Sequence, residues 1–474
     1  MSLFPEEAPE PSSPEEQEPV EIPVDVPAPT AKGNRQRPLP TPPPGMTWEA
    51  TPAPALQLTP LLHEATEDGR YHRHTAGGRI AATLANLREL RQENPDLTPR
   101  QLAQLAREPA TGLRDDLIER LAALDTAAAD PRLLEEERYL LNQDLLDGRD
   151  GKVATEAQVA DFLAMAANPG PDSRVLDLCC GSGRLLVHAW LHMLRQTETG
   201  KNPITGRLQG IERNMDLAEA AATGLRLHGI TGAGVAQANS LNPEECHEAG
   251  VEDGQWDFVI TNLPLGLKVR KDQFGYYGRK PEDILYTVKS SRARMDSEIL
   301  MLQRVRDLLA PGHGRAALIV SDGLLSNSSD RFARDWMMNH LALEGVISLP
   351  RKSRSSATAK TSVLLLRRMA PGETQADESQ IFMAICENDG HDGRKETSAR
   401  YAIDQKEGDT QRIVMLHNDL VDYMTAETRL SDGSWRRTRR IPVLDANHAS
   451  ILSHLNDFRR DPAGWESEQA AATS

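Results

Sequence analysis

Residues 174–186 combine a carboxylate, two glycines and the beginning of an apolar run, which is typical of a ligand-binding turn. A strand is predicted to end at Asp177, and Gly181 and Gly183 follow before a helix begins. Glycine lets the backbone turn sharply and lets a ligand approach without a Cβ clash, while N–H groups at a helix start suit an anionic group. A dinucleotide fingerprint requires a third glycine where the chain has Leu186. The turn therefore disfavours a pyrophosphate, which Asp177 would also repel.

A second carboxylate, Glu212, ends the next predicted strand within the run Gly210-Ile-Glu. A carboxylate at this point can accept hydrogen bonds from both hydroxyls of a ribose. Asp177, in turn, suits a ligand that carries a cationic amine. As a pair in a strand–turn–helix context, the two acids match the S-adenosylmethionine site of Rossmann-like methyltransferases. We therefore expect S-adenosylmethionine as the cofactor.

A third polar position follows a strand predicted over residues 258–260, where the chain continues with Asn262, Leu263, Pro264 and Leu265. Pro264 blocks continuation of a helix. The amide oxygen of Asn262 and a neighbouring backbone carbonyl, held on a rigid turn, can both accept hydrogen bonds from an exocyclic amine. Such a turn would orient the nitrogen lone pair toward a methyl donor, which is catalysis by positioning.

The elements that must hold these three turns are short apolar runs that alternate with helical stretches. This alternation predicts an α/β fold with a parallel, doubly wound, Rossmann-like sheet, and its ligand crevice should lie at the carboxyl ends of the strands. The expected strands cover residues 174–178, 208–211, 258–261, 316–320, 345–349, 362–366 and 381–386.

Composition divides the chain into four expected parts. Residues 1–60 hold 16 of the 31 prolines together with many acidic residues and predict a disordered tail. Residues 61–148 predict a helical domain, in which Ile80, Leu84, Leu87 and Leu90 share one face and Thr98 caps a helix. Residues 149–370 predict the methyltransferase domain. Residues 371–474 predict a mixed extension, helical from 416 onward, with a basic cluster over residues 436–440.

Charge and composition restrict the function. The chain has 54 Lys and Arg against 70 Asp and Glu, a net charge of −16, which disfavours a self-sufficient nucleic-acid binder. Its 4 cysteines do not form a disulfide framework. No apolar run reaches the ~20 residues of a membrane span, and residues 1–11 lack the features of a signal peptide. We therefore expect a cytoplasmic, multi-domain protein that binds no metal.

The ordered set of motifs resembles the methylation subunit of type I restriction–modification systems, a group of adenine-specific DNA methyltransferases. Residues 151–156 are similar to the segment that precedes the cofactor turn in that family, and residues 177–186 to the turn itself. Residues 210–212 and 227–230 are similar to its second strand and following helix, and residues 261–266 to its Asn-Pro-Pro-Phe/Tyr motif. Later similarities, over residues 308–317, 345–350, 360–363 and 381–392, extend the resemblance to roughly 140–395.

The resemblance implies roles for individual residues. Binding of S-adenosylmethionine would fall to Thr155, Asp177, Cys179, Gly181, Gly183, Glu212, Asn239 and Asn262. Asn239, where the family usually has Asp, would lie beside the adenine of the cofactor. Asn262 and the carbonyl of Leu263 would accept from the 6-amino group of the target adenine, within a catalytic motif formed by Asn262, Leu263, Pro264 and Leu265.

Three positions depart from the family pattern. Leu263 replaces the first proline of the motif, Leu265 replaces the aromatic residue that stacks on an extruded base, and Glu156 replaces the proline after Thr155. These departures leave open a non-catalytic relative that binds S-adenosylmethionine in an assembly or regulatory role. Transfer to RNA or to a protein amide is a second alternative. A nucleotide-binding oxidoreductase is a third, which Leu186 and Asp177 disfavour.

The resemblance also implies partners, namely DNA and a separate specificity subunit that recognises the target sequence. Extrusion of a base requires a positive groove that holds the duplex, and the acidic chain is poorly suited to provide one alone. The basic residues that could meet phosphates are Arg279, Lys280, Lys289, Arg292, Arg294, Arg351, Lys352 and Arg354. The terminal helices would contact the partner subunit.

Overall fold

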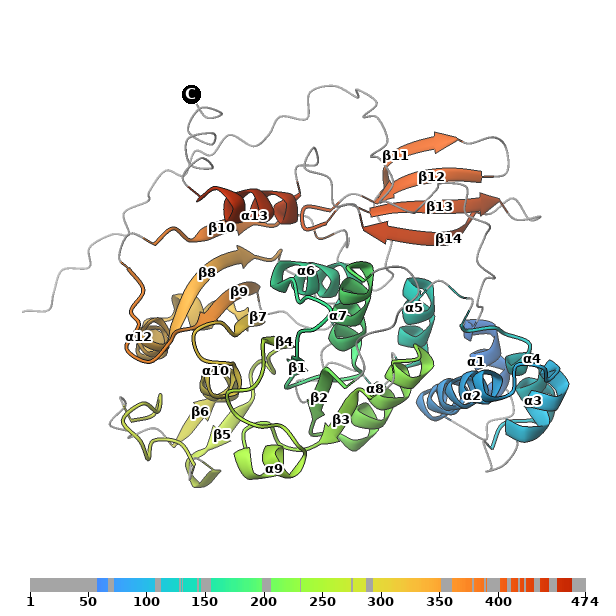
Figure 1. The fold of residues 1–474 in the computed structure, drawn as a ribbon, viewed down its shortest axis with the longest axis horizontal. Coiled ribbons are helices and arrows are strands. Elements are labelled where there is room, and N and C mark those ends of the chain that lie inside the picture. Colours follow the sequence, from blue (N-terminus) through green and yellow to red (C-terminus); the bar gives the residue numbers. More distant parts are fainter. Residues whose placement is uncertain are drawn as a thin grey trace, which may run out of the picture. The chain divides into compact units, whose positions relative to one another are not determined.

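The short apolar runs form one eight-stranded sheet, ordered β10-β8-β9-β7-β4-β1-β2-β3, in the computed structural model of the chain (Figure 1). Branched apolar side chains favour a pleated backbone that is buried on both faces. The strands are β1 (Val175–Asp177), β2 (Leu208–Glu212), β3 (Gly234–Gln237), β4 (Phe258–Asn262), β7 (Arg315–Ser321), β8 (Leu341–Ser348), β9 (Thr361–Arg368) and β10 (Phe382–Ile385).

The structure describes most of the chain between residues 58 and 462, and all of the described residues belong to one compact unit. The described ranges are 58–66, 72–106, 112–127, 129, 131–142, 145, 155–197, 206–230, 232–273, 276–286, 293–350, 360–376, 379–387, 389, 401–406, 411–416, 418–421, 423–429, 435–442 and 450–462. The predicted tail therefore lies outside the described residues, except that Leu58–Pro60 begin the first helix. The four predicted domain limits stay predictions.

The sheet is mostly parallel, as the alternating pattern predicts, but β9 pairs antiparallel with both of its neighbours, β7 and β8. Residues 349–360 connect β8 to β9, and β9 runs back beside β8 in the opposite direction. The order of the sheet reverses at β1, because β2 pairs with one edge of β1 and β4 with the other.

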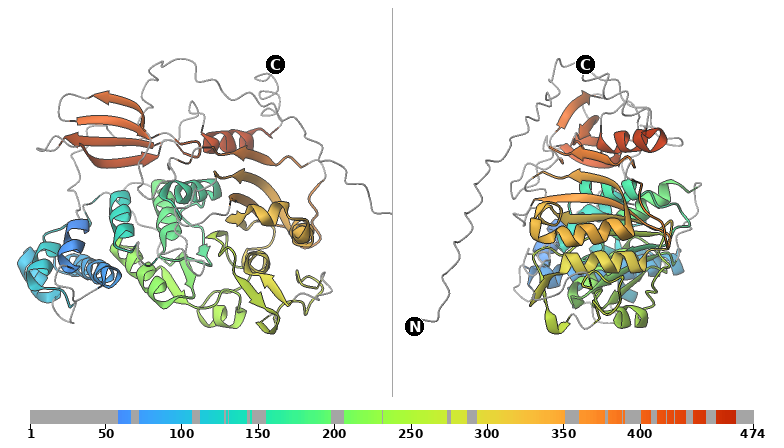
Figure 2. Two further views of the ribbon diagram at one scale, coloured as in Figure 1. Left: turned by 180° about the vertical axis from the view of Figure 1, so that it is seen from behind. Right: turned by 90° about the vertical axis from the view of Figure 1, so that its left-hand side faces the viewer.

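Different helices bury the two faces of the sheet (Figures 1 and 2). One face packs on α6 (Ala157–Ala167), α7 (Arg184–Arg195), α8 (Met215–Leu227) and α13 (Ile451–Arg460), and the other packs on α10 (Ser297–Leu308) and α12 (Arg331–His340). Neighbouring residues of one strand, such as Val175 and Leu176, belong to the two different cores. This alternation is the period of a strand, and it confirms the doubly wound α/β fold.

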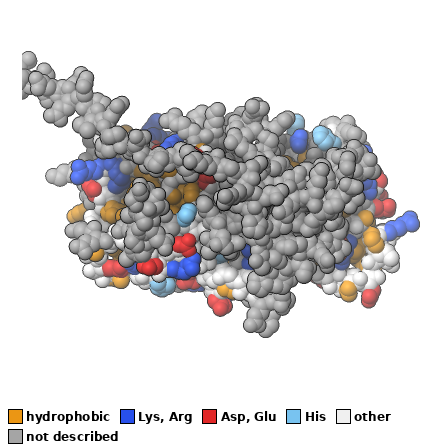
Figure 3. Space-filling model, turned by 90° about the horizontal axis from the view of Figure 1, so that it is seen from above, with side chains coloured by type: hydrophobic (Ala, Val, Ile, Leu, Met, Phe, Trp, Pro, Cys, Tyr) orange, Lys and Arg blue, Asp and Glu red, His pale blue; other side chains and the backbone are white. Residues whose placement is uncertain are grey.

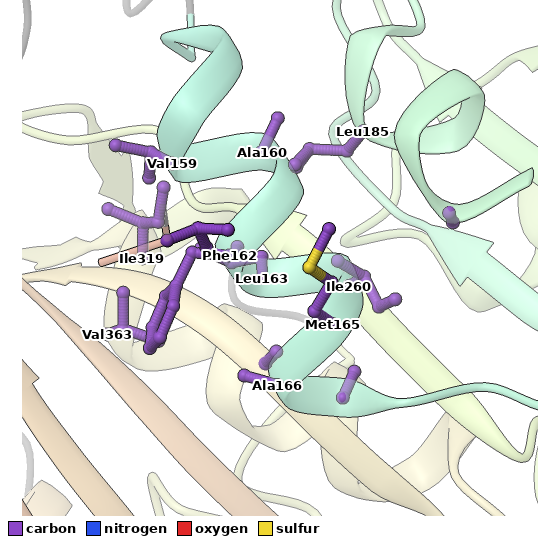
Figure 4. Packing of buried hydrophobic residues seen from close by; sticks show 14 of the residues in the cluster. Val159, Ala160, Phe162, Leu163, Met165, Ala166, Leu185, Ile260, Ile319 and Val363 are labelled. Carbon is purple, nitrogen blue, oxygen red and sulfur yellow. The ribbon is translucent and has the colours of Figure 1, made fainter. Parts of the chain in front are cut away.

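Helix α6 shows why an almost entirely apolar segment forms a helix here. Phe162, Leu163 and Met165 pack together with Ile260 of β4 and Val363 of β9 (Figure 4). The helix ends at Asn168, which takes the left-handed conformation at φ 58° that asparagine tolerates better than most residues. Because α6 covers β4, it fixes the strand whose end carries Asn262.

The predicted helical region forms α1 (Leu58–Thr66), α2 (Arg73–Glu93), α3 (Pro99–Ala106), α4 (Asp115–Ala122) and α5 (Pro131–Leu141). The predicted Leu stripe of α2 is a core stripe, since Ile80, Leu84 and Leu87 are buried and Leu90 packs against them. Thr98 and Gln101 form a reciprocal cap, in which the Thr98 N–H donates to Gln101 Oε1 at 2.9 Å. The apolar core of these helices includes Leu227 of α8.

The prediction of helices from residue 416 onward is wrong for residues 423–429 and 435–442, which form strands. A second sheet, ordered β11-β12-β13-β14, contains β11 (Tyr401–Lys406), β12 (Gln411–Leu416), β13 (Tyr423–Arg429) and β14 (Trp435–Pro442), all antiparallel. The basic cluster lies on β14. Trp435, Thr438 and Ile441 are of the aromatic and β-branched types that strands favour, but the four arginines among them leave no alternating pattern in the sequence. Only α13 fulfils the helical expectation among the described residues of this region.

The sequence does not predict several short elements near the strand ends. They are β5 (Lys268–Arg270), β6 (Arg294–Asp296), α9 (Pro243–Glu248) and α11 (Asp322–Ser326), together with the sheet strand β3. β5 and β6 pair antiparallel in a two-stranded ribbon. Three to six residues are too few to show a period. No helix within the described ranges is long and apolar enough to cross a bilayer.

Candidate functional site

A cavity of about 820 Å³ lies at the carboxyl ends of β1, β2 and β4, at the point where the strand order reverses. Open α/β sheets bind ligands at such a switch point. Most of the residues that the sequence singles out line this one cavity: Thr155, Asp177, Cys179, Gly181, Glu212, Asn239, Asn262, Leu263 and Pro264. Gly183 and Leu265 do not belong to the described lining.

The two glycines of the turn serve different purposes. Gly181 has φ +54°, and a Cβ added there would meet no atom within 4 Å, so this glycine leaves an open approach to the cavity. Gly183 has φ +84° and lies at the start of α7, where an added Cβ would come 3.1 Å from the Cβ of Ala221. Gly183 therefore allows α7 and α8 to pack closely, and the structure gives it a role in packing. Its predicted role in cofactor binding stays a prediction.

Asp177 is the most deeply buried acid in the cavity wall, with 1 % of its surface exposed. Its Oδ1 accepts hydrogen bonds from Thr261 Oγ1 at 2.7 Å and from the Cys179 N–H at 3.1 Å. Its Oδ2 is buried and has no hydrogen-bond partner. Burial, together with the nearby charge of Glu212, raises the pKa of the Asp177 carboxyl to about 7, although the bonds from Thr261 and Cys179 oppose this rise.

Glu212 is held in place by backbone donors. Its Oε2 accepts from the Gly181 N–H at 3.0 Å, and its Oε1 accepts from the Asn214 N–H at 2.8 Å. The close approach of β2 to the turn requires glycine at position 210, where an added Cβ would lie 2.8 Å from the sulfur of Cys180. Glu212 and the glycine turn therefore form one rigid unit, and each oxygen can still accept a further hydrogen bond.

Asn239 follows β3 and lines the same cavity. Its backbone N–H donates to Glu245 Oε2 at 2.7 Å, and its side-chain Oδ1 accepts from the Leu241 N–H at 3.2 Å. The second bond forms a local turn of the kind that asparagine favours. It fixes the amide, so that Asn239 presents a defined polar group to the cavity.

The amide of Asn262 is anchored at one end. Its Nδ2 donates to Thr155 Oγ1 at 3.0 Å. This bond fixes the orientation of the amide, in which Oδ1 is the acceptor atom. The turn that follows is tied to the fold on both sides: the Leu263 N–H donates to the Ile319 carbonyl at 3.2 Å, and Ser297 Oγ donates to the Pro264 carbonyl at 3.1 Å. A rigid turn therefore forms although Leu263 replaces proline.

The cavity lining includes residues that the sequence reasoning missed, among them Tyr139, Arg184 and Tyr276. Tyr276 lies 39 % exposed, edge-to-face with Tyr277 at 5.4 Å between ring centroids. No short motif surrounds Tyr139 or Tyr276, and their contribution follows only from the packing of distant segments. Arg184 directly follows Gly183 in the glycine turn, but its residue type alone did not indicate a place in the cavity wall. Among the predicted basic residues, Arg279 lines the cavity, while Lys289, Arg292, Arg351, Lys352 and Arg354 lie outside the described residues.

The residues fit S-adenosylmethionine. A buried carboxylate oxygen without a partner, on Asp177, matches the need of an ammonium group for an acceptor. Glu212 offers two acceptor oxygens for ribose hydroxyls, and the open approach at Gly181 leaves room for a ligand beside the turn. The cavity volume lies within the range of pockets that bury small ligands and cofactors.

Two curated relatives resemble part of the chain. The EcoEI methylase subunit of a type I restriction enzyme from Escherichia coli is 24% identical over 264 residues, which cover 54% of this chain and 50% of that protein. The MjaVIII methylase subunit from Methanocaldococcus jannaschii is 25% identical over 234 residues, which cover 48% of this chain and 38% of that protein. The chain thus spans about half or less of the length of these relatives.

The fold is also that of a solved structure, a modification subunit assigned to a type I restriction enzyme of Vibrio vulnificus YJ016. The two chains superpose with a TM-score of 0.51 at 17% identity, over 71% of this chain and 87% of the other. The sequence profile described as N-6 DNA Methylase matches residues 139–419. This match spans more than half of the chain and includes every predicted site residue, and the protein therefore belongs to the N-6 DNA methylase family.

Proposed function

We propose that the chain is an S-adenosylmethionine-dependent methyltransferase that acts on the 6-amino group of adenine in DNA. The observation that carries the proposal is the single cavity in which the acids Asp177 and Glu212 and the amide of Asn262 meet. Methyl transfer requires a donor and an acceptor nitrogen in contact, and one cavity at a switch point can hold both.

The cofactor end of the cavity is formed by Asp177, Gly181, Glu212 and Asn239. Bound S-adenosylmethionine would supply an electrophilic methyl group on a sulfonium sulfur. Asp177 Oδ2 would accept a hydrogen bond from the ammonium group, and this charge would favour the ionised form of the carboxyl. Glu212 would accept from the ribose hydroxyls, and Asn239 would contact the adenine. Cys179 would contribute van der Waals contact, since burial raises the pKa of its thiol.

The acceptor end of the cavity is the turn after β4. Asn262 Oδ1 and the Leu263 carbonyl would accept the two hydrogens of the 6-amino group and direct its lone pair toward the methyl donor. The bond from Asn262 Nδ2 to Thr155 would hold the amide in the orientation that this requires. This role needs no acid or base of matched pKa, and the gain comes from orientation.

DNA and a separate specificity subunit are the partners that we propose. Lys268 and Arg279 line the cavity and could contact phosphates, although Lys268 already pairs with Asp296. On the face seen from above, the described side chains that are visible include basic, acidic and hydrophobic ones (Figure 3). A chain of net charge −16 is poorly suited to hold a duplex alone. Both curated relatives carry the name of a methylase subunit. A cytoplasmic location is part of the proposal.

A methyl-transfer assay tests the proposal. The chain and its partner subunit receive tritiated S-adenosylmethionine together with DNA, RNA or protein as acceptor, and digestion of the product identifies the modified base. We expect label in N6-methyladenine of DNA, and loss of this label with Asn262→Ala. Equal transfer by wild type and variant would remove Asn262 from the mechanism, and label confined to RNA or protein would overturn the substrate.

A further inference from the structure

A buried ion pair on α5 holds the backbone of the glycine turn. The side chains of Arg138 and Glu135 are 0 % and 2 % exposed. Nε and Nη2 of Arg138 each donate to one oxygen of Glu135, at 2.6 Å in both cases. The remaining nitrogen, Nη1, donates to the carbonyl of Ser182 at 2.9 Å. Ser182 lies between the two glycines of the turn, so the guanidinium fixes the turn from a helix that lies 44 residues earlier in the sequence.

The fold makes room for this guanidinium. At Gly224, in α8, an added Cβ would lie 2.9 Å from the Cζ of Arg138. Glycine within a helix costs roughly 0.5–1 kcal/mol relative to alanine, so its presence here shows that the space is required. His228, one turn further along the chain, places Nε2 3.1 Å from Glu135 Oε2. Arg138 therefore occupies a closely fitting space between α5 and α8.

A second arginine extends the same cluster to the acceptor end of the cavity. Arg184 places its guanidinium 3.4 Å from the ring centroid of Tyr139, on α5, and its Nε 3.7 Å from Glu135 Oε1. Its Nη1 donates to the carbonyl of Thr155 at 2.8 Å. Thr155 accepts the hydrogen bond that anchors the amide of Asn262. The α5 cluster thus contacts the backbone at both ends of the cavity.

The buried carboxylate of the cluster depends on its buried partners for its ionised form. Burial opposes the ionised form of Glu135, but Arg138 and His228 together more than offset this effect and hold the pKa of the Glu135 carboxyl well below its usual range. Burial lowers the pKa of His228, which favours a neutral imidazole, and Arg138 is then the main positive partner of Glu135. Loss of Arg138 would leave a buried carboxylate without its bidentate partner.

We propose that Arg138 is a positioning residue that fixes the glycine turn through Ser182 and couples the packing of the N-terminal helices to cofactor affinity. α5 packs against α1 and α2 as well as against α7. A shift of these helices would therefore move Arg138, which anchors the turn through the Ser182 carbonyl. The inference rests on the proposed cofactor site. It assigns the helices upstream of the sheet a part in forming that site.

The test uses a matched arginine on the same helix. Arg132 Nη1 donates to both oxygens of the buried Asp161 on α6, at 2.5 and 2.6 Å, and it does not line the cavity. The full chain is titrated calorimetrically with S-adenosylmethionine as wild type, Arg138→Met, Arg138→Lys and Arg132→Met. Thermal unfolding of each variant reports the loss of stability separately from the loss of affinity.

We expect Arg138→Met to raise the Kd about tenfold or more, the effect of losing a hydrogen bond to a charged group. Arg138→Lys should raise it less, because one donor can still reach the carbonyl. Arg132→Met should lower the Tm about as much as Arg138→Met does, and it should leave the Kd within about twofold of the wild-type value.

Equal affinities of wild type and Arg138→Met would overturn the inference while leaving the proposed function intact. An equal loss of affinity with Arg132→Met would also overturn it, because general destabilisation would then explain both variants. If Arg138→Met does not fold, Arg138→Lys decides, and an unchanged Kd in that variant contradicts the inference. Absence of saturable binding by the wild-type chain contradicts the proposed function and the inference together.

Discussion

The two ends of the cavity are built differently. At the ends of β1 and β2, Asp177 and Glu212 are held by backbone N–H groups, and Asp177 keeps an oxygen without a partner. At the end of β4, the amide of Asn262 is held by a side chain, Thr155 Oγ1, and the following turn departs from the family pattern at two positions. The glycine turn supplies backbone donors to both acids of the cofactor end, and Thr261 Oγ1 adds one further hydrogen bond to Asp177. The amide of Asn262, by contrast, depends on the side chain of Thr155 from a separate segment.

This difference implies that binding and methyl transfer can be separated by substitution. Changes at the ends of β1 and β2 should act on cofactor affinity, and changes at the end of β4 should act on the rate of transfer. Thr155 is the residue at which the two ends meet, since it lines the cavity and anchors Asn262. The following substitutions test this separation, beginning with the largest expected effect.

Replacing Asn262 with alanine should reduce methyl transfer to adenine by on the order of 100-fold or more, because the amine loses the acceptor that orients it. The Kd for S-adenosylmethionine should change by less than about threefold. Single-turnover transfer and calorimetric titration measure the two quantities on the same protein. A parallel loss of affinity and rate would show that the two ends of the cavity are not separable.

Replacing Asp177 with asparagine should raise the Kd for S-adenosylmethionine about 10- to 100-fold, since a charge-assisted hydrogen bond is worth roughly 1.5–3 kcal/mol. Transfer at saturating cofactor should fall far less. Calorimetry and initial rates at high cofactor concentration distinguish these effects. An unchanged Kd would place the ammonium group of the cofactor elsewhere.

The same substitution should stabilise the protein without cofactor, and more so at high pH. The pKa of Asp177 rises from an ordinary value of 3.8 to about 7 in the folded chain. Ionisation is therefore easier in the unfolded chain, and wild type loses stability as the pH rises from about 4 to about 7. We expect Asp177→Asn to gain on the order of a few kcal/mol more at pH 8 than at pH 4.

Thermal or denaturant unfolding at the two pH values checks this result. Asp172, whose side chain is 91% exposed, provides the control, because Asp172→Asn should leave the pH dependence nearly unchanged. An equal gain in stability from Asp177→Asn at both pH values would mean that burial does not raise the pKa of the Asp177 carboxyl.

Replacing Thr155 with valine should have the smallest effect of these substitutions. It tests whether the two ends of the cavity can be separated. Valine keeps the shape and the backbone carbonyl that accepts from Arg184, and it removes only the acceptor for Asn262 Nδ2. A neutral hydrogen bond contributes about 0.5–1.5 kcal/mol, so the transfer rate should fall roughly 2- to 10-fold with little change in Kd. A larger effect on Kd than on rate would assign Thr155 to the cofactor instead.

The sequence predicts the parts of the site that depend on local pattern. An apolar run followed by a polar residue marks the ends of β1, β2 and β4, and the topology of a parallel sheet then brings Asp177, Glu212 and Asn262 to one edge. The long helix α2 is predictable for the same reason, because Ile80, Leu84, Leu87 and Leu90 recur at helical spacing.

The remaining features depend on contacts between distant segments. Nothing near Arg138 in the sequence indicates that its side chain reaches Ser182, because the pairing arises only when α5 packs on α7 and α8. Gly183 looks like a ligand-binding glycine, but its environment is Ala221 of another helix. Strand β14 is not evident from the sequence because four of its residues are arginines, and pairing with neighbouring strands outweighs local preference.

The most direct test of the central claim is a calorimetric titration of the full chain with S-adenosylmethionine and, separately, with NAD, in wild type and Glu212→Ala. The account predicts saturable binding of one S-adenosylmethionine per chain, no binding of NAD, and a large loss of S-adenosylmethionine affinity in the variant. Preference for NAD, or an S-adenosylmethionine affinity that Glu212→Ala leaves unchanged, would contradict it.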